Sequence, residues 1–204
     1  MKIAMDRQRV AKTWVYRGLC DLYFAFDNDD PAFENNAKFS EIMGLEKFLK
    51  AILLYEQHTK YEALPLSEAR AEINKMAMNL GHKFTKMIKS LSDSGLIDFD
   101  RIKQSDFDGY DGSQLIQAVE AGYMETRYPV PQLISDKFPI EGTDLTHDPL
   151  SSSGLTKFIY ALCNACYLRL ASNIDFTQML DQFRNTFQEK ESFGRFNNLF
   201  WQIK

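Results

Sequence analysis

Long hydrophobic runs, cysteines and histidines are all scarce in this 204-residue sequence. Its wholly apolar stretches last only a few residues, whereas a helix that crosses a bilayer needs about 20, so we expect no membrane-spanning segment. The first residues contain no apolar stretch of the kind that directs secretion. Three cysteines, an odd number, together with the missing export signal predict reduced thiols and a cytoplasmic protein.

Sequence motifs for common catalytic and metal centres are missing as well. The chain has no glycine-rich phosphate loop, no strand-to-helix nucleophile turn and no His-Glu-x-x-His pair. Cys163 and Cys166 have the spacing of half a zinc site, but a second ligand pair is lacking, and thiols on an apolar helix face pack as small hydrophobes. Asp106, Asp108 and Asp111 do not have calcium-loop spacing. We therefore expect no metal and no cofactor.

Charge is distributed unevenly along the chain, whose net charge is −4. Residues 91–148 carry 4 basic and 12 acidic side chains, whereas residues 38–90 carry 9 basic and 6 acidic ones. The overall acidity argues against indiscriminate binding of nucleic acid, which requires a basic surface. Residues 38–90 are the only segment in which we would seek a phosphate site, with Lys47 and Lys50 as candidate ligands. The alternative is a helix pair with solvated lysines.

Apolar residues recur with a helical period through most of the chain. The strongest signal covers residues 34–61, where a continuous apolar stripe consists of Phe39, Ile42, Leu45, Leu49, Ile52 and Leu53. Similar spacing predicts helices over residues 6–26, 73–91, 113–128, 155–170 and 175–187. Because no alternation of strand period competes with this pattern, the sequence predicts an all-α fold.

Several residues predict where these helices begin, break and end. Ser67 and Ser113 are expected to cap the helices that follow them. Gly81 in a helix interior predicts a kink or a break. The Ser-, Asp- and Gly-rich residues 92–112 predict a loop, and four of the six prolines predict an irregular stretch over 129–149.

Three segments resemble parts of one protein family. Residues 37–51, with the run Leu45-Glu46-Lys47-Phe48-Leu49-Lys50-Ala51, resemble the second helix of the HEPN superfamily. The pair Gly81-His82 is similar to the Gly-His segment that opens the family's third helix, and Arg127-Tyr128-Pro129 resembles the end of its fourth helix. The resemblance covers about residues 6–135 and leaves residues 150–204 unexplained.

The resemblance implies an antiparallel up-and-down bundle of four or five helices over residues 1–135, of a type that commonly forms homodimers. A Pro/Ser/Gly-rich connection (136–154) would join it to a C-terminal helical extension (155–204). Many family members are metal-independent endoribonucleases in defence, stress or toxin–antitoxin systems. Others are non-catalytic modules that bind nucleotides or a partner protein such as a minimal nucleotidyltransferase.

The family's nuclease motif, an arginine followed four to six residues later by a histidine, is not present here. No arginine stands at those positions before His58, His82 or His147, and none of the corresponding positions after Arg127 holds a histidine. This argues against the family's usual cleavage chemistry, in which a cation stabilises the phosphorane and imidazole moves the proton of the 2'-hydroxyl.

The remaining site candidates are His82, Arg127 and Tyr128, which the resemblance implies lie near one end of the bundle. There His82 and Arg127 would hold an anion. The alternative is structural: His82 caps a helix or bonds to the backbone, Arg127 pairs with a buried carboxylate such as Glu46, and Tyr128 is a packed ring.

Residues 176–200, which directly precede Trp201, contain six of the sixteen phenylalanines. So aromatic a segment is expected to dock, either on its own bundle or at a dimer interface. Two functions follow from the sequence. The first is a non-catalytic HEPN-like module that dimerises and binds a partner protein or a nucleotide. The second is a divergent RNA-binding endoribonuclease that uses His82 and Arg127.

Overall fold

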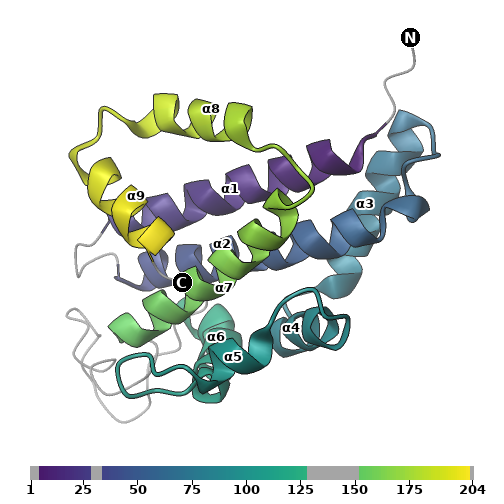
Figure 1. Cartoon of the computed structure of the whole chain (residues 1–204). Coiled ribbons are helices and arrows are strands. Elements are labelled where there is room, and N and C mark those ends of the chain that lie inside the picture. The colour runs from purple at the N-terminus through teal and green to yellow at the C-terminus, as the bar shows by residue number, and fades with distance from the viewer. Residues whose placement is uncertain (1–4, 29–33, 128–151, 203–204) are drawn as a thin grey trace.

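The computed structural model describes residues 5–28, 34–127 and 152–202, and Figure 1 shows their arrangement. The predicted all-α fold is confirmed, because no β-strand forms in these ranges. The helices are α1 (Arg7–Asp27), α2 (Glu34–Glu56), α3 (Leu66–Leu80), α4 (Phe84–Asp93), α5 (Phe99–Gln104), α6 (Gly112–Arg127), α7 (Ser153–Ala171), α8 (Thr177–Phe187) and α9 (Glu191–Gln202). In the part of the chain described, no helix has both the length and the hydrophobicity to cross a membrane.

Helix α2 lies at the centre of the fold and forms an antiparallel pair with α1 (Figure 1). Leu45 and Leu49 of its predicted apolar stripe are fully buried. The pair packs closely because glycine occupies both sides of the contact. A Cβ atom added to Gly18 would lie 2.8 Å from the Phe48 ring, and one added to Gly44 would lie 2.7 Å from Leu22. Neither position accommodates a larger residue without a shift in the packing.

The predicted break at Gly81 is confirmed, because α3 ends at Leu80 and α4 begins at Phe84. Gly81 has φ of +59°, in the left-handed region that glycine adopts without steric cost. This turn connects α3 to α4 and contains His82, which lies beside Glu46 of α2.

Three boundary predictions are wrong. Ser67 does not cap α3, because the carbonyl of Pro65 already accepts the first helical hydrogen bond, from the amide of Ala69 at 2.8 Å. Ser113 does not cap α6, because the Asp111 carboxylate accepts hydrogen bonds from two amides in the first turn of that helix.

The predicted loop over residues 92–112 contains the short helix α5, which Asp98 caps. Residues 129–149, predicted to be irregular, lie outside the described residues.

The C-terminal helices complete the core. Helix α7 packs along α2, while α8 and α9 cover α1 (Figure 1). Helix α9, which no predicted helix covers, buries Phe193, Phe196 and Phe200. The Phe196 ring lies 5.3 Å from that of Tyr23 in α1, and Phe200 lies 5.6 Å from Tyr160 in α7. These aromatic side chains therefore pack against α1 and α7 of the same chain.

Candidate functional site

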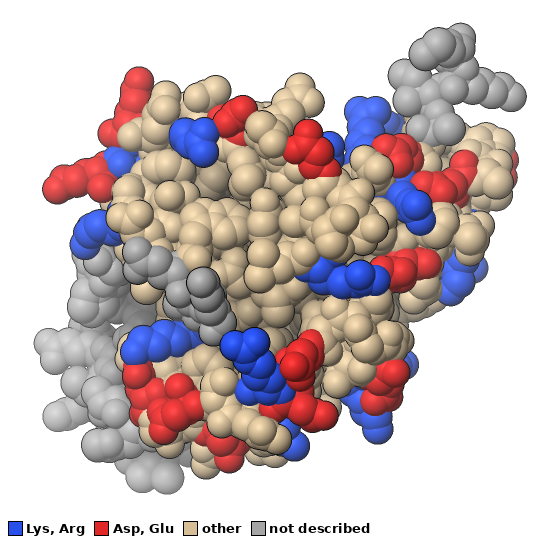
Figure 2. All heavy atoms as spheres, in the orientation of Figure 1, with Lys and Arg blue, Asp and Glu red and all other residues tan. Residues whose placement is uncertain are grey.

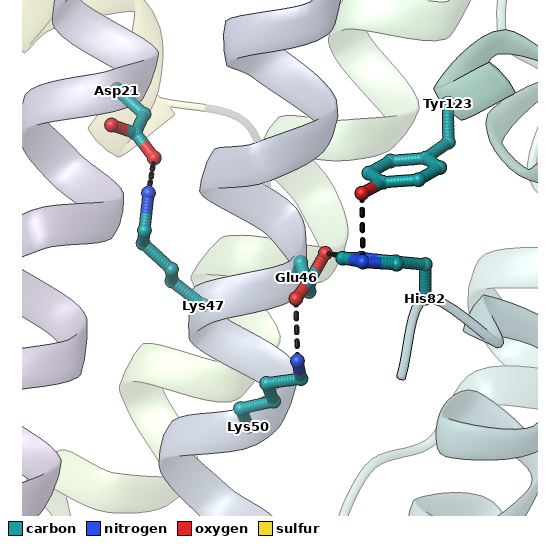
Figure 3. A network of polar contacts seen from close by, with 6 residues as sticks. All are labelled: Asp21, Glu46, Lys47, Lys50, His82 and Tyr123. Atoms are coloured by element: carbon teal, nitrogen blue, oxygen red, sulfur yellow. Dashed lines mark hydrogen bonds and ion pairs between the residues drawn. The ribbon is translucent and has the colours of Figure 1, made fainter. Parts of the chain in front are cut away.

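A network of polar side chains connects α2, the turn before α4 and α6 (Figure 3). Glu46 and Lys50 are one turn apart on α2, His82 follows Gly81, and Tyr123 comes from α6. The arrangement depends on two local features of the sequence. The i, i+4 spacing places the two α2 side chains on one face, and the left-handed turn at Gly81 brings the imidazole to that face.

The contacts within this network are short. One oxygen of the Glu46 carboxylate lies 2.6 Å from Nδ1 of His82, and the other accepts a hydrogen bond from Nζ of Lys50 at 2.5 Å. Nε2 of His82 lies 2.7 Å from the hydroxyl of Tyr123, and the two rings are stacked with centroids 3.9 Å apart. Both ring nitrogens of the histidine are therefore occupied by protein groups.

Burial differs sharply between the members of the network. The side chains of Glu46 and Lys50 are only 4% and 6% exposed, whereas that of His82 is 43% exposed. A carboxylate and an ammonium group removed from water are tolerated only when each is paired and hydrogen-bonded. Glu46 and Lys50 satisfy this requirement by pairing with each other inside the core. The imidazole of His82 connects this buried pair to the protein surface.

The chemistry open to His82 follows from this geometry. A carboxylate on Nδ1 fixes the orientation of an imidazole and favours a proton on that nitrogen, as in many histidines that act as general bases. A general base must also present its second nitrogen to a substrate. Here Tyr123 occupies that position, so the network joins α2, the turn before α4 and α6 instead of presenting a free base.

The two predicted ligand lysines both have partners inside the protein. Lys50 is bonded to Glu46, and Lys47 forms an ion pair with Asp21 of α1 (Figure 3). Burial raises the pKa of Asp21 above its ordinary value, although the ammonium group of Lys47 opposes the shift. Neither ammonium group is one of the solvated lysines that the alternative interpretation expected.

Arg127 and Tyr128 bear on the catalytic interpretation, but their side chains lie outside the described residues. Helix α6 ends at Arg127. The predicted structural partner of that arginine, Glu46, has its two oxygens on Lys50 and His82. The imidazole bonds to side chains, not to the backbone as the structural alternative supposed.

Two members of the network were not predicted as site residues. Tyr123 lies in the helix predicted over residues 113–128, with no site role expected, and Glu46 is predicted only as a partner for Arg127. The i, i+4 spacing of Glu46 and Lys50 is a visible signal in the sequence. No signal connects Tyr123 with His82, because these residues are far apart in sequence and belong to different elements, helix α6 and the turn before α4.

The cysteines and aspartates considered as metal ligands have other roles. Cys163 and Cys166 are buried on α7, and burial raises the pKa of both thiols, that of Cys166 to about 12. Asp106 accepts a hydrogen bond from the amide of Gly109 at 2.8 Å. Asp108 pairs with Lys157 at 2.6 Å, which lowers the pKa of its carboxyl group. Among the described residues, no group of three or more metal-ligating side chains comes together.

Comparisons of the chain with protein-family models, curated proteins and solved structures find no match.

Proposed function

We propose that this protein is a non-catalytic HEPN-like module that dimerises and binds a partner protein or a nucleotide, in a stress, defence or toxin–antitoxin context. The observation that carries the proposal is the occupation of both ring nitrogens of His82 by Glu46 and Tyr123. A histidine held in this way connects helices. The family likeness of residues 37–51 and of the Gly81-His82 turn supports the same assignment, and a nucleotidyltransferase is the partner that the likeness suggests.

A largely uncharged face over α7 supports dimerisation. Figure 2 shows charged side chains around the rim of this face and few in its middle. Leu168 on α7 is 63% exposed, and Leu199 on α9 is 36% exposed. The rings of Tyr167 and Trp201 pack between these helices with centroids 4.8 Å apart. Exposed apolar side chains beside partly buried aromatic ones are typical of the centre of a protein interface.

Replacing Leu168 with glutamate is expected to abolish the dimer, because a charge at the centre of an apolar interface would lose its hydration on association. Light scattering after size-exclusion chromatography should give twice the chain mass for the wild type and the chain mass for the variant. Met78→Glu is the matched control, since Met78 is 78% exposed on α3, and it should leave the dimer intact. A wild-type monomer at every concentration would contradict the proposal.

A divergent endoribonuclease is the second candidate, and one observation favours it: a buried carboxylate orients an imidazole that is 43% exposed. Displacement of Tyr123 by a substrate would free Nε2. Labelled RNA incubated with wild type, His82→Ala and Arg127→Ala separates the two functions. We expect no cleavage even at high protein concentration. Cleavage that both substitutions abolish would establish the enzyme and refute the non-catalytic module.

A further inference from the structure

A groove of about 550 Å³ lies between α1 and α3, away from the Glu46–His82 network. Its volume is within the range of small-molecule sites, roughly 300–1,000 Å³. Helix α3 lies beside the N-terminal part of α1 at this end of the molecule (Figure 1). The groove combines an apolar floor with cationic groups, and the side chains that matter are Arg9, Val10, Trp14, Arg17, Arg70 and Ile73.

The three arginines of this groove form no ion pair among the described residues. Arg9, Arg17 and Arg70 are all exposed. Two carboxylates close to them in sequence pair with lysines instead: Asp21, one turn after Arg17, pairs with Lys47, and Glu72 on α3 pairs with Lys75. Three guanidinium groups from two helices thus surround one groove with their donors directed to solvent or to a ligand. Guanidinium is the side-chain group best suited to bidentate contact with phosphate.

The floor of the groove is apolar and includes an aromatic ring. Val10 and Ile73 are 5% and 7% exposed, and the half-buried indole of Trp14 packs beside them. A partly exposed indole flanked by guanidinium groups offers a stacking surface for a planar heterocycle, worth about 1–3 kcal/mol per base where aromatic side chains stack on nucleic-acid bases.

We infer that this groove binds a nucleoside polyphosphate. The base would lie against Trp14, and the phosphates would be held by Arg9, Arg17 and Arg70. A simple anion would make no use of the aromatic floor, and a neutral aromatic compound would leave three guanidinium groups unused. The inference rests on the proposed binding function and deepens it, since it gives the nucleotide a site formed by α1 and α3.

Trp14 itself reports binding. The chain has two tryptophans, so Trp201→Phe leaves Trp14 as the only indole. The Trp201→Phe protein is titrated with ATP, adenosine, pyrophosphate or dodecyl phosphate while the fluorescence of Trp14, excited at 295 nm, is recorded. Each titration is repeated by calorimetry. We expect ATP to quench Trp14 and to bind at least about tenfold more tightly than each of the other three compounds.

Substitution of the arginines locates the site. Arg70→Ala and Arg9→Ala should each weaken ATP binding by about tenfold or more, because each removes a charge-assisted hydrogen bond. Arg101→Ala on α5 is the matched control: Arg101 is also exposed and does not line the groove. It should bind ATP like the wild type. Circular dichroism confirms that the variants fold.

Five results would overturn the inference: no binding of ATP at millimolar concentration, equal binding of adenosine, equal binding of pyrophosphate, equal binding of dodecyl phosphate, or undiminished binding by the Arg9→Ala/Arg70→Ala double variant. Equal binding of dodecyl phosphate would instead identify a site for anionic amphiphiles. The RNA assay keeps the two proposals apart. Cleavage that requires His82 refutes the non-catalytic function, and the ATP titration then still decides whether the groove binds a nucleotide. If ATP does not bind, only the proposed nucleotide site is refuted.

Discussion

Replacing Glu46 with alanine is expected to lower the free energy of unfolding by about 3–5 kcal/mol, because it leaves the ammonium group of Lys50 buried without a counter-charge. Lys50 is only 5% exposed, and Glu46 is its hydrogen-bond partner among the described residues. His82 loses its anchor as well, but water reaches its half-exposed ring. Urea unfolding followed by circular dichroism measures the change.

A second variant separates the buried charge from simple loss of packing. Replacing both residues with apolar ones of similar size, as in Glu46→Leu/Lys50→Met, removes the pair without leaving an unpaired charge, so it should be within about 2 kcal/mol of the wild type. Asp181→Ala is the surface control. Its ion pair with Arg184 is 54% and 58% exposed, and its loss should cost less than about 1 kcal/mol. If the double variant is as unstable as Glu46→Ala, the interpretation of the network is wrong.

Replacing Phe200 with alanine is expected to cost about 3–5 kcal/mol, the range for a fully buried aromatic side chain. Its ring is completely buried and packs 6.1 Å from the ring of Phe48 in α2. Its backbone carbonyl accepts a hydrogen bond from the buried amide of Asn164 at 2.6 Å. Thermal and urea unfolding give the change, and Asn198→Ala, at an exposed position of α9, should change stability by less than about 1 kcal/mol.

Deleting residues 193–204 tests the same helix more severely. The deletion removes Phe193, Phe196 and Phe200 from the core and exposes Tyr23 and Tyr160, which now pack on them. The shortened chain should melt at a lower temperature or elute as a larger, associated species. An unchanged melting temperature together with an unchanged elution volume would show that α9 contributes nothing to the core.

The helices were predictable because their apolar residues repeat with a helical period, and the break at Gly81 because glycine is costly inside a helix. Helix α5 was missed because Ser, Asp and Gly dominate its surroundings. Helix α9 lies within the predicted C-terminal helical extension (155–204), but it was not predicted as a separate helix because Gly194 and two asparagines lower its helix propensity, although Phe193, Phe196 and Phe200 have helical spacing. Tertiary packing stabilises it.

The site was less predictable than the fold. The family likeness and the local charge point to His82, Lys47 and Lys50, and each of these side chains makes a polar contact inside the protein. The pairing of Tyr123 with His82 depends on where α6 crosses α2. The groove between α1 and α3 depends on the path of the chain after α2. Neither arrangement leaves a periodic signal in the sequence.

The position of α9 also determines when the protein can fold during its synthesis. Tyr23 and Phe48 belong to the first helical pair but are covered by residues 193–200. While the ribosome is still producing the middle of the chain, the α1–α2 pair therefore has an incomplete apolar surface. The core is therefore completed only after α9 has left the exit tunnel, so chaperone binding to the nascent α1–α2 pair should influence the yield of folded protein.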